Sequence, residues 1–270
     1  MKKKPIGVYD SGVGGLTVLK TLHEKFPEES FVYFGDTLNL PYGAKSQAQI
    51  IAYSRTIIDW FQQEIGVKLI VAACHTSSAL ALEEISEEGG VVPIIGTIHP
   101  LVKGLLKEGS SQKIGIIATP ASVKSLAHEK IFIKAGFQGE MVSIACPDFV
   151  PLIEAEHWDR DALKKAAETY LKIFEERHLD TLIYGCTHYP FIKSIIEEVL
   201  PAGTKTLDPA ELIALEVFEK LSEKELLNQD GVTGSSYFLC SSHPEAFAEK
   251  VRKLAGLENP KVILNNIHSS

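Results

Sequence analysis

The stretch Leu69-Ile70-Val71-Ala72-Ala73-Cys74-His75-Thr76 has a second, altered copy in Thr181-Leu182-Ile183-Tyr184-Gly185-Cys186-Thr187-His188. In both copies a short apolar run ends in a small residue, and a cysteine follows at once. An apolar run of this length bounded by small and polar residues is typical of a buried β-strand. Cys74 and Cys186 are 112 residues apart, so the pattern indicates that the chain contains two related halves.

A second pair of segments supports the repeat. Ile6-Gly7-Val8-Tyr9-Asp10-Ser11 opens one half, and Ile114-Gly115-Ile116-Ile117-Ala118-Thr119 opens the other, at an offset of 108 residues. Two similar α/β units of roughly 100 residues give near-equal offsets of this kind. Chance similarity between apolar strands is the alternative explanation for such short matches.

Strand-like runs alternate with helical periods along the whole chain. The expected strands are Ile6–Tyr9, Phe31–Phe34, Lys68–Ala73, Val92–Ile95, Lys113–Ala118, Met141–Ala145, Asp180–Tyr184 and Lys205–Leu207, with weaker signals at Phe238–Cys240 and Val262–Leu264. Helical faces are expected from Ile50, Ile57, Phe61 and Ile65, and from Leu163, Ala167, Tyr170 and Phe174. This alternation predicts an α/β fold with mainly parallel sheets, whose ligands bind at the carboxyl ends of the strands.

Composition narrows the class of protein further. The chain has 270 residues, 45% of them hydrophobic, and a net charge of −8. This acidic balance argues against nucleic acid as a partner, because phosphate binding needs a basic surface. The longest apolar runs are too short for a membrane span, and Asp10 comes too early for a signal peptide. We therefore expect a cytoplasmic protein in which the four cysteines serve chemistry or burial rather than disulfides.

Each repeated cysteine is expected at the start of a helix. Pro190 suits the first turn of the helix that follows Cys186. A thiol at a helix N-terminus lies near the positive end of the helix dipole, which favours the thiolate. Each thiol also has an imidazole nearby in the sequence, from His75 and His188 respectively. We therefore expect the pKa of both thiols to fall toward neutrality.

Two such thiols facing each other across one cleft have the geometry that racemisation needs. One group removes the α-proton from one face of an amino acid, and the other returns a proton to the opposite face. No lysine context suggests a pyridoxal Schiff base, so the carbanion would depend on desolvation and preplaced donors. We expect Ser11, Thr76, Thr119 and Thr187 to bind carboxylates, and Asp10 to bind the ammonium group.

Several of these residues also have a simpler interpretation. Free cysteines are often simply buried, which is the interpretation we adopt for Cys146 and Cys240. The Cys-His pairs suggest zinc only weakly, since no dense ligand cluster accompanies them, and no metal is expected. The glycine-rich segment 12–15 lacks the Gly-Lys-Ser/Thr ending of a phosphate loop, so a tight turn that brings backbone to a small ligand is favoured. Trp60 and Trp158 are expected to pack.

These segments together resemble the glutamate racemases of the aspartate/glutamate racemase superfamily. The matching motifs are Gly7-Val8-Tyr9-Asp10-Ser11-Gly12-Val13-Gly14-Gly15-Leu16-Thr17, Gly35-Asp36-Thr37, Pro41-Tyr42-Gly43, Ala73-Cys74 with Thr76, Thr119-Pro120-Ala121, Pro151-Leu152-Ile153-Glu154 and Gly185-Cys186-Thr187-His188-Tyr189-Pro190. The first and the last are the most specific, and the motifs run through most of the chain.

The resemblance implies two pseudo-symmetric α/β domains with the active site between them. It implies that residues 1–98 and 209–270 form the first domain and 99–208 the second, since the end of the chain returns to the first domain. It also implies a homodimer that interconverts L- and D-glutamate without a cofactor, for peptidoglycan synthesis. Its partner is then a small-molecule substrate, with no nucleic acid or membrane.

The resemblance also assigns roles to particular residues. Cys74 and Cys186 become the catalytic acid/base pair, supported by three polar residues, which are Asp10, Glu154 and His188. The residues expected to contact substrate are Ser11, Pro41, Tyr42, Gly43, Thr76, Thr119, Thr187 and His188, together with Asp10 and His75. Without the resemblance, Glu154 would be expected to lie in solvent.

One position departs from the family pattern. The family usually has asparagine after the first cysteine, whereas this chain has His75. Asparagine offers a donor and an acceptor, while histidine is larger and titratable. Two alternatives therefore stay open, which are a racemase for aspartate or another acidic amino acid, and an inactive relative that binds an amino acid.

Overall fold

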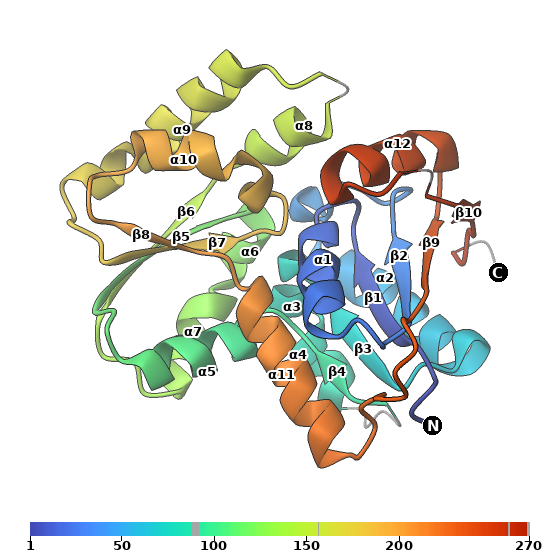
Figure 1. Ribbon diagram of the computed structural model, residues 1–270. Coiled ribbons are helices and arrows are strands. Elements are labelled where there is room, and N and C mark those ends of the chain that lie inside the picture. Colours follow the sequence, from blue (N-terminus) through green and yellow to red (C-terminus); the bar gives the residue numbers. More distant parts are fainter. Residues whose placement is uncertain (88–91, 156, 259, 269–270) are drawn as a thin grey trace.

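The structure is a computed structural model, and it describes residues 1–87, 92–155, 157–258 and 260–268. Its strands form two parallel sheets that lie side by side (Figure 1). The first sheet has the order β10-β9-β2-β1-β3-β4, with strands β1 (Ile6–Asp10), β2 (Phe31–Gly35), β3 (Leu69–Ala72), β4 (Ile94–Ile95), β9 (Ser236–Cys240) and β10 (Val262–Leu264). The second has the order β6-β5-β7-β8, with strands β5 (Lys113–Ala118), β6 (Glu140–Ala145), β7 (Thr181–Gly185) and β8 (Lys205–Leu207).

The sheet orders confirm the repeat that the sequence predicted. In the first sheet β1 lies between β2 and β3, with β4 beyond β3. In the second sheet β5 lies between β6 and β7, with β8 beyond β7. These four strands of each sheet therefore match one to one in chain order, and every predicted strand is present with ends shifted by no more than two residues.

The end of the chain returns to the first sheet, as expected from the resemblance. β9 pairs with β2, and β10 pairs with β9 as the edge strand. We call the part of the chain around the first sheet the first half, and the part around the second sheet the second half. The domain boundaries after residues 98 and 208 stay predictions.

Helices cover both faces of each sheet. Those of the first half are α1 (Leu16–Lys25), the 3-10 helix η1 (Tyr42–Ala44), α2 (Gln47–Trp60), the π-helix η2 (Phe61–Ile65), α3 (His75–Leu80), α4 (Leu82–Glu87), α11 (Ala210–Glu223) and α12 (Pro244–Ala255). Those of the second half are α5 (Ile98–Glu108), α6 (Pro120–Ser125), α7 (Ala127–Lys134), α8 (Phe149–Glu154), α9 (Arg160–Glu175), the 3-10 helix η3 (Tyr189–Ile192) and α10 (Lys193–Val199).

The alternation of side chains along the strands explains the layers. Ile6 and Val8 of β1 pack on one face of the first sheet, in a cluster with buried residues of α1, α11 and α12. Tyr9 and its neighbours on the other face pack against α2, η2 and α3. The second sheet is covered in the same way, by α5 and α7 on one face and by α8, α9 and α10 on the other. Buried parallel sheets of this kind need apolar residues on both faces.

The predicted helical faces are largely those that the structure buries. Ile50, Ile57 and Phe61 are buried, and Ile65 is half-buried. On α9 the side chain of Leu171 is buried, whereas Tyr170 lies at the edge of the core with its ring against Phe149. None of the helices in the described part of the chain is long and apolar enough to cross a membrane.

Candidate active site

Cys74 and Cys186 both follow the carboxyl end of a central strand. Cys74 comes two residues after β3 and is the N-cap of α3, as predicted. Cys186 directly follows β7, but the next helical turn, η3, begins only at Tyr189, with Pro190 in its first turn. The helix start was therefore predicted correctly for Cys74 and three residues too early for Cys186.

The two cysteines line the same cavity, which has a volume of about 310 Å³. Each is nearly buried, with exposed fractions of 5% for Cys74 and 6% for Cys186. The other residues of the wall are Ser11, Leu40, Pro41, Tyr42, Gly43, Ala44, His75, Thr76, Thr119, Pro120, Cys146, Pro147, Val150, Pro151, Thr187 and His188. The structure thus gathers residues from both halves, including nearly every residue that the resemblance placed against substrate.

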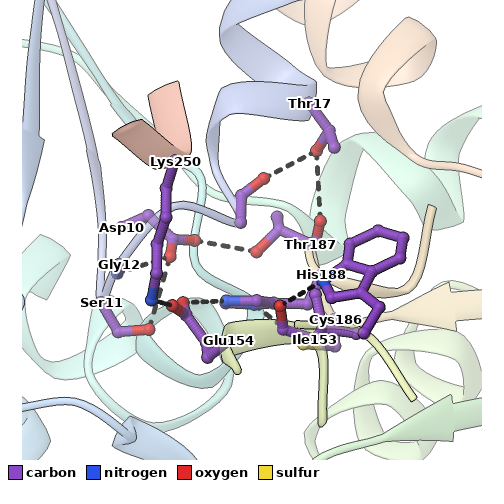
Figure 2. Close-up of polar contacts among 12 residues, drawn as sticks. Asp10, Ser11, Gly12, Thr17, Ile153, Glu154, Cys186, Thr187, His188 and Lys250 are labelled. Carbon is purple, nitrogen blue, oxygen red and sulfur yellow. Dashed lines mark hydrogen bonds and ion pairs between the residues drawn. The ribbon is translucent and has the colours of Figure 1, made fainter. Parts of the chain in front are cut away.

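A chain of polar contacts leads away from Cys186 (Figure 2). The Cys186 Sγ lies 3.7 Å from His188 Nδ1, and His188 Nε2 lies 2.7 Å from Glu154 Oε1. The other carboxylate oxygen of Glu154 accepts a hydrogen bond from Lys250. Glu154 is therefore not in solvent, as its residue type alone would suggest, but is held between two cationic partners.

Along this chain of contacts, the polar partners of His188 and Glu154 shift their pKa values more than burial does. Burial alone would lower the pKa of His188, but its contacts with Cys186 and Glu154 hold that pKa well above the ordinary value. Burial alone would raise the pKa of Glu154, but His188 and Lys250 lower it to about 2. Because opposite charges stabilise each other at short distance, the geometry favours an imidazolium beside the Cys186 thiol.

The surroundings of Cys74 are different, and they correct the predicted fall of its pKa. Burial, with the charge of Asp10 as a smaller contribution, raises the pKa of Cys74 to about 12, although the backbone N–H of Ser77 acts in the opposite direction. Desolvation of the thiolate thus exceeds the favourable effect of the short helix α3. The imidazole of His75 is no partner for Cys74 either, because its ring lies against another histidine.

That histidine is His128 of α7, which no pattern in the sequence identifies as a site residue. The ring centroids of His75 and His128 are 5.8 Å apart, and the planes are inclined by only 18°. Both side chains are buried. Burial lowers the pKa of His75 well below its ordinary value, and lowers the pKa of His128 to about 4. Within the described residues, His75 Nδ1 and His128 Nε2 have no hydrogen-bond partner.

Asp10 lies behind the cavity wall rather than in it. It is fully buried, and its carboxylate accepts hydrogen bonds from Thr187 Oγ1 at 2.9 Å and from the backbone N–H of Gly12 at 2.9 Å. The Ser11 hydroxyl lies 3.4 Å from the same carboxylate. Asp10 therefore joins the first half to the second, and it fixes two hydroxyl groups that do line the cavity.

Hydroxyl groups also connect the halves on the other side of the cavity. Thr76 Oγ1 lies 3.0 Å from Thr119 Oγ1, and both are within 3.3 Å of Ser122 Oγ. Thr119 is also the N-cap of α6 and accepts from the backbone N–H of Ser122. Thr76 and Thr119 are thus held as a pair by a hydrogen bond in which either hydroxyl can be the donor.

The prediction that the glycine-rich segment 12–15 brings its backbone to a ligand is wrong, and its glycines serve the packing of the two halves. None of its four residues is part of the cavity wall. A Cβ on Gly14 would lie 2.5 Å from both His188 Nδ1 and Thr187 Oγ1, and one on Gly12 would lie 2.9 Å from Glu154 Oε1. Gly12 and Gly14 lack side chains because site residues of the second half pack directly against their backbone.

The loop that contains Pro41, Tyr42 and Gly43 closes the cavity on a third side. The Tyr42 hydroxyl donates to Asp36 at 2.6 Å, so the loop is tied to the carboxyl end of β2. A Cβ on Gly43 would lie 2.7 Å from Thr119 Cβ, so this glycine too permits contact between the halves.

Some residues of the site escaped the sequence analysis. Cys146, for which only burial was expected, lines the cavity just after β6, in a position that matches Cys186 after β7. Its place after a strand end was the available signal. Lys250 lies on α12, far along the chain from Glu154, and no pattern in the sequence connects them. The described residues include no group of three or more His, Cys, Asp or Glu side chains able to hold a metal ion.

A parallel α/β fold with acid/base side chains on two walls of one small cavity defines an enzyme of proton-transfer chemistry. The model of the Asp/Glu/Hydantoin racemase family matches residues 14–217, so the chain belongs to this family. It is an amino-acid racemase by fold, site and similarity.

The named relatives are consistent with one another. The chain is 41% identical over 248 residues to a glutamate racemase of Trichormus variabilis, covering 92% of this chain and 83% of the relative. It matches the structure of Thermus thermophilus glutamate racemase with β-chloro-D-alanine at 39% identity and a TM-score of 0.85, covering 99% and 98% of the two chains. The match to Francisella tularensis glutamate racemase with D-glutamate has 32% identity and a TM-score of 0.89, over 100% of both chains.

The contact of Gly14 with the second half generates a first prediction. The Gly14→Ala substitution is expected to lower the free energy of unfolding by roughly 1–3 kcal/mol, because the methyl group meets His188 and Thr187. It should also lower kcat by more than the loss of folded protein explains. Gly7→Ala is the matched control, since the atoms nearest its Cβ would belong to the ring of Phe61, at 3.0 Å, and not to a site residue. Equal specific activities of the two folded variants would contradict this assignment.

The buried histidine pair generates a prediction about pH. The pKa of His128 is lowered to about 4 in the folded state, so below pH 6.5 the unfolded chain binds a proton that the folded chain does not. Stability is therefore lost as the pH falls from about 6.5 to 4, by an amount on the order of 3 kcal/mol. His128→Phe keeps an aromatic ring and removes this loss. Urea unfolding at pH 7 and pH 5 should show a smaller decline for the variant, and an equal decline would refute the prediction.

Proposed function

We propose that this racemase interconverts L- and D-glutamate, with Cys74 and Cys186 as the two acid/base groups. One observation carries the proposal, which is that both thiols line one cavity and come from opposite halves of a repeated fold. The similarity to glutamate racemases, one of them with D-glutamate, supports glutamate as the substrate. The cavity volume is near the lower end of the range of roughly 300–1,000 Å³ for small-molecule sites, which suits a small amino acid.

The unequal surroundings of the thiols suggest how a cycle starts. Cys186 acts as a thiolate beside the imidazolium of His188 and takes the α-proton to form its S–H bond, and the electrons of the C–H bond stay on the α-carbon. Cys74, whose raised pKa keeps its proton in place at neutral pH, then gives this proton to the opposite face. The S–H bond of Cys74 breaks as the new C–H bond forms, so the thiols exchange their protonation states. The opposite enantiomer reacts in the reverse direction.

The wall of the cavity offers donors for the substrate's carboxylates. Thr76 and Thr119 supply hydroxyl donors, while Leu40, Val150 and the proline side chains exclude water. Ser11 and Thr187 donate their single protons to Asp10, so they offer lone pairs to the substrate instead. In a water-poor site such donors act more strongly on developing charge than they do in solvent. Among the described residues, those of the wall include no lysine for a pyridoxal Schiff base. We propose a cofactor-independent reaction because the resemblance implies one. Asp10 contributes by fixing Ser11 and Thr187.

The wider role of the protein is proposed from the resemblance, and its location from the sequence pattern. We infer that its D-glutamate is used in peptidoglycan synthesis, that it works in the cytoplasm, and that it forms a homodimer. We also retain residues 1–98 with 209–270, and residues 99–208, as its two domains.

Incubation with D-glutamate in deuterated water tests the reaction. The proposal expects loss of optical purity together with deuterium at the α-carbon. Exchange with aspartate alone would favour the first alternative, a racemase for another acidic amino acid. Binding of an amino acid without exchange would favour the second, an inactive relative. The stacked pair of His75 and His128 is the specific observation that keeps both alternatives in view, because a neutral imidazole stands where the family has an amide.

Substitution of the thiols tests the mechanism. Cys74→Ser and Cys186→Ser are each expected to lower kcat by roughly 10³-fold or more, because a hydroxyl is a much weaker acid than a thiol. Cys240→Ser is the control, since Cys240 is a buried free cysteine that does not line the cavity. Polarimetry of both enantiomers provides the measurement. Full activity in either active-site variant would rule out a two-thiol reaction.

The histidine after Cys74 gives a further prediction. His75→Asn restores the amide donor and acceptor of the family pattern, and we expect it to raise kcat/KM for glutamate severalfold. The ratio of kcat/KM for glutamate and aspartate, measured for the wild-type and variant enzymes, checks this. An unchanged ratio would show that the position tolerates either side chain.

A further inference from the structure

Helix α12 reaches from the first half to the end of α8 in the second half (Figure 1). Two lysines one turn apart on α12 make the contact. Lys250 forms an ion pair with Glu154, and Lys253 Nζ lies 5.6 Å from the ring centroid of Trp158. Trp158 is itself fixed, because its indole N–H donates to the Ile153 carbonyl at 2.8 Å. We call these two contacts the α12 clasp.

The Lys250 contact differs from the other lysine ion pairs of the surface. The Glu154 side chain is only 11% exposed, and that of Lys250 is 31% exposed, so solvent screens this pair less than a fully exposed one. The carboxylate of Glu154 is shared, with one oxygen on Lys250 and the other on His188. Lys250 therefore restricts rotation of the carboxylate on which the orientation of the His188 ring depends (Figure 2).

The contact between Lys250 and Glu154 joins the packing of the two halves to the residues beside Cys186. Cys186, His188 and Glu154 all belong to the second half, whereas Lys250 belongs to the first. The pair can form only when α12 and α8 lie against each other. α8 also supplies Val150 and Pro151 to the cavity wall, so the same approach encloses the cavity.

We propose that Lys250 is a positioning residue, which holds Glu154, and through it His188 beside Cys186, when the two halves are closed. This inference rests on the proposed proton transfer at Cys186. Lys250 itself touches neither the thiol nor the cavity. Lys253 forms the other contact of the α12 clasp, with Trp158, and does not act on Glu154.

The effect on pH dependence has a defined sign. The charged groups in contact with Glu154 are His188, from the segment before η3, and Lys250, from α12. The hydroxyl of Tyr33, from β2, also feels the charge of Glu154. Removing the Lys250 ammonium takes away one of the two cations that favour the carboxylate, so the pKa of Glu154 must rise. Activity that needs ionised Glu154 then begins to fall at a higher pH.

Three variants test the proposal on the full-length enzyme. Lys250→Met is expected to lower kcat about tenfold and to move the acid limb of the pH profile upward. Lys250→Arg should restore most of kcat, because a guanidinium also pairs with a carboxylate. Lys253→Met, the matched control on the same helix face, should change kcat by less than about twofold and leave the acid limb in place. Equal effects of Lys250→Met and Lys253→Met would overturn the proposal.

A measurement without substrate separates this inference from the proposed function. Titration of ¹³C-labelled glutamate carboxylates by NMR, with the Glu154 signal assigned by its loss in Glu154→Gln, reports the pKa of Glu154 directly. We expect a higher pKa of Glu154 in Lys250→Met than in the wild type. In Lys250→Arg we expect the pKa of Glu154 to stay close to the wild-type value. An unchanged pKa in Lys250→Met would refute the role of Lys250. A wild-type enzyme that did not racemise glutamate would instead refute the proposed function, while the titration would still be interpretable.

Discussion

The buried hydrogen bond from Thr187 to Asp10 is the contact on which the geometry of the site depends. It joins the carboxyl ends of β1 and β7, one from each half, at 2.9 Å. Such a close approach requires that nothing intervene, and the glycines of segment 12–15 meet this requirement. A buried carboxylate is stable only when its lone pairs are satisfied, so the halves are held in the arrangement that satisfies them. That arrangement brings both cysteines to one cavity.

The fold is nearly symmetric, but its chemistry is not. Cys186 has an imidazole and a carboxylate behind it, whereas Cys74 has a buried apolar setting and the charge of Asp10 nearby. The repeat therefore explains why two thiols are opposed, and the divergence of the halves explains why their surroundings differ. A reaction that uses each group alternately as acid and base does not need identical surroundings. It needs only that each state be accessible in turn.

The sequence predicted the strands, the repeat and the cavity residues that directly follow strand ends, because apolar runs and the residues after them follow local rules. Pro41, Tyr42 and Gly43 were placed at the site only through the resemblance. It predicted the pKa of Cys74 in the wrong direction, since desolvation depends on the whole surroundings and not on neighbours in the chain. Lys250 and His128 were not predicted for the same reason, as their partners are distant in sequence. Glu154 was identified as a site residue only through the resemblance, and its burial could not be inferred from its residue type.

The return of β9 and β10 to the first sheet means that the polypeptide crosses between the halves twice. A body attached at one point can swing in any direction, but one attached at two points turns mainly about the line that joins them. The two chain crossings thus restrict rotation of the second half mainly to the axis that joins them. A rotation of the halves about that line would change the width of the cavity, because both halves contribute to its wall.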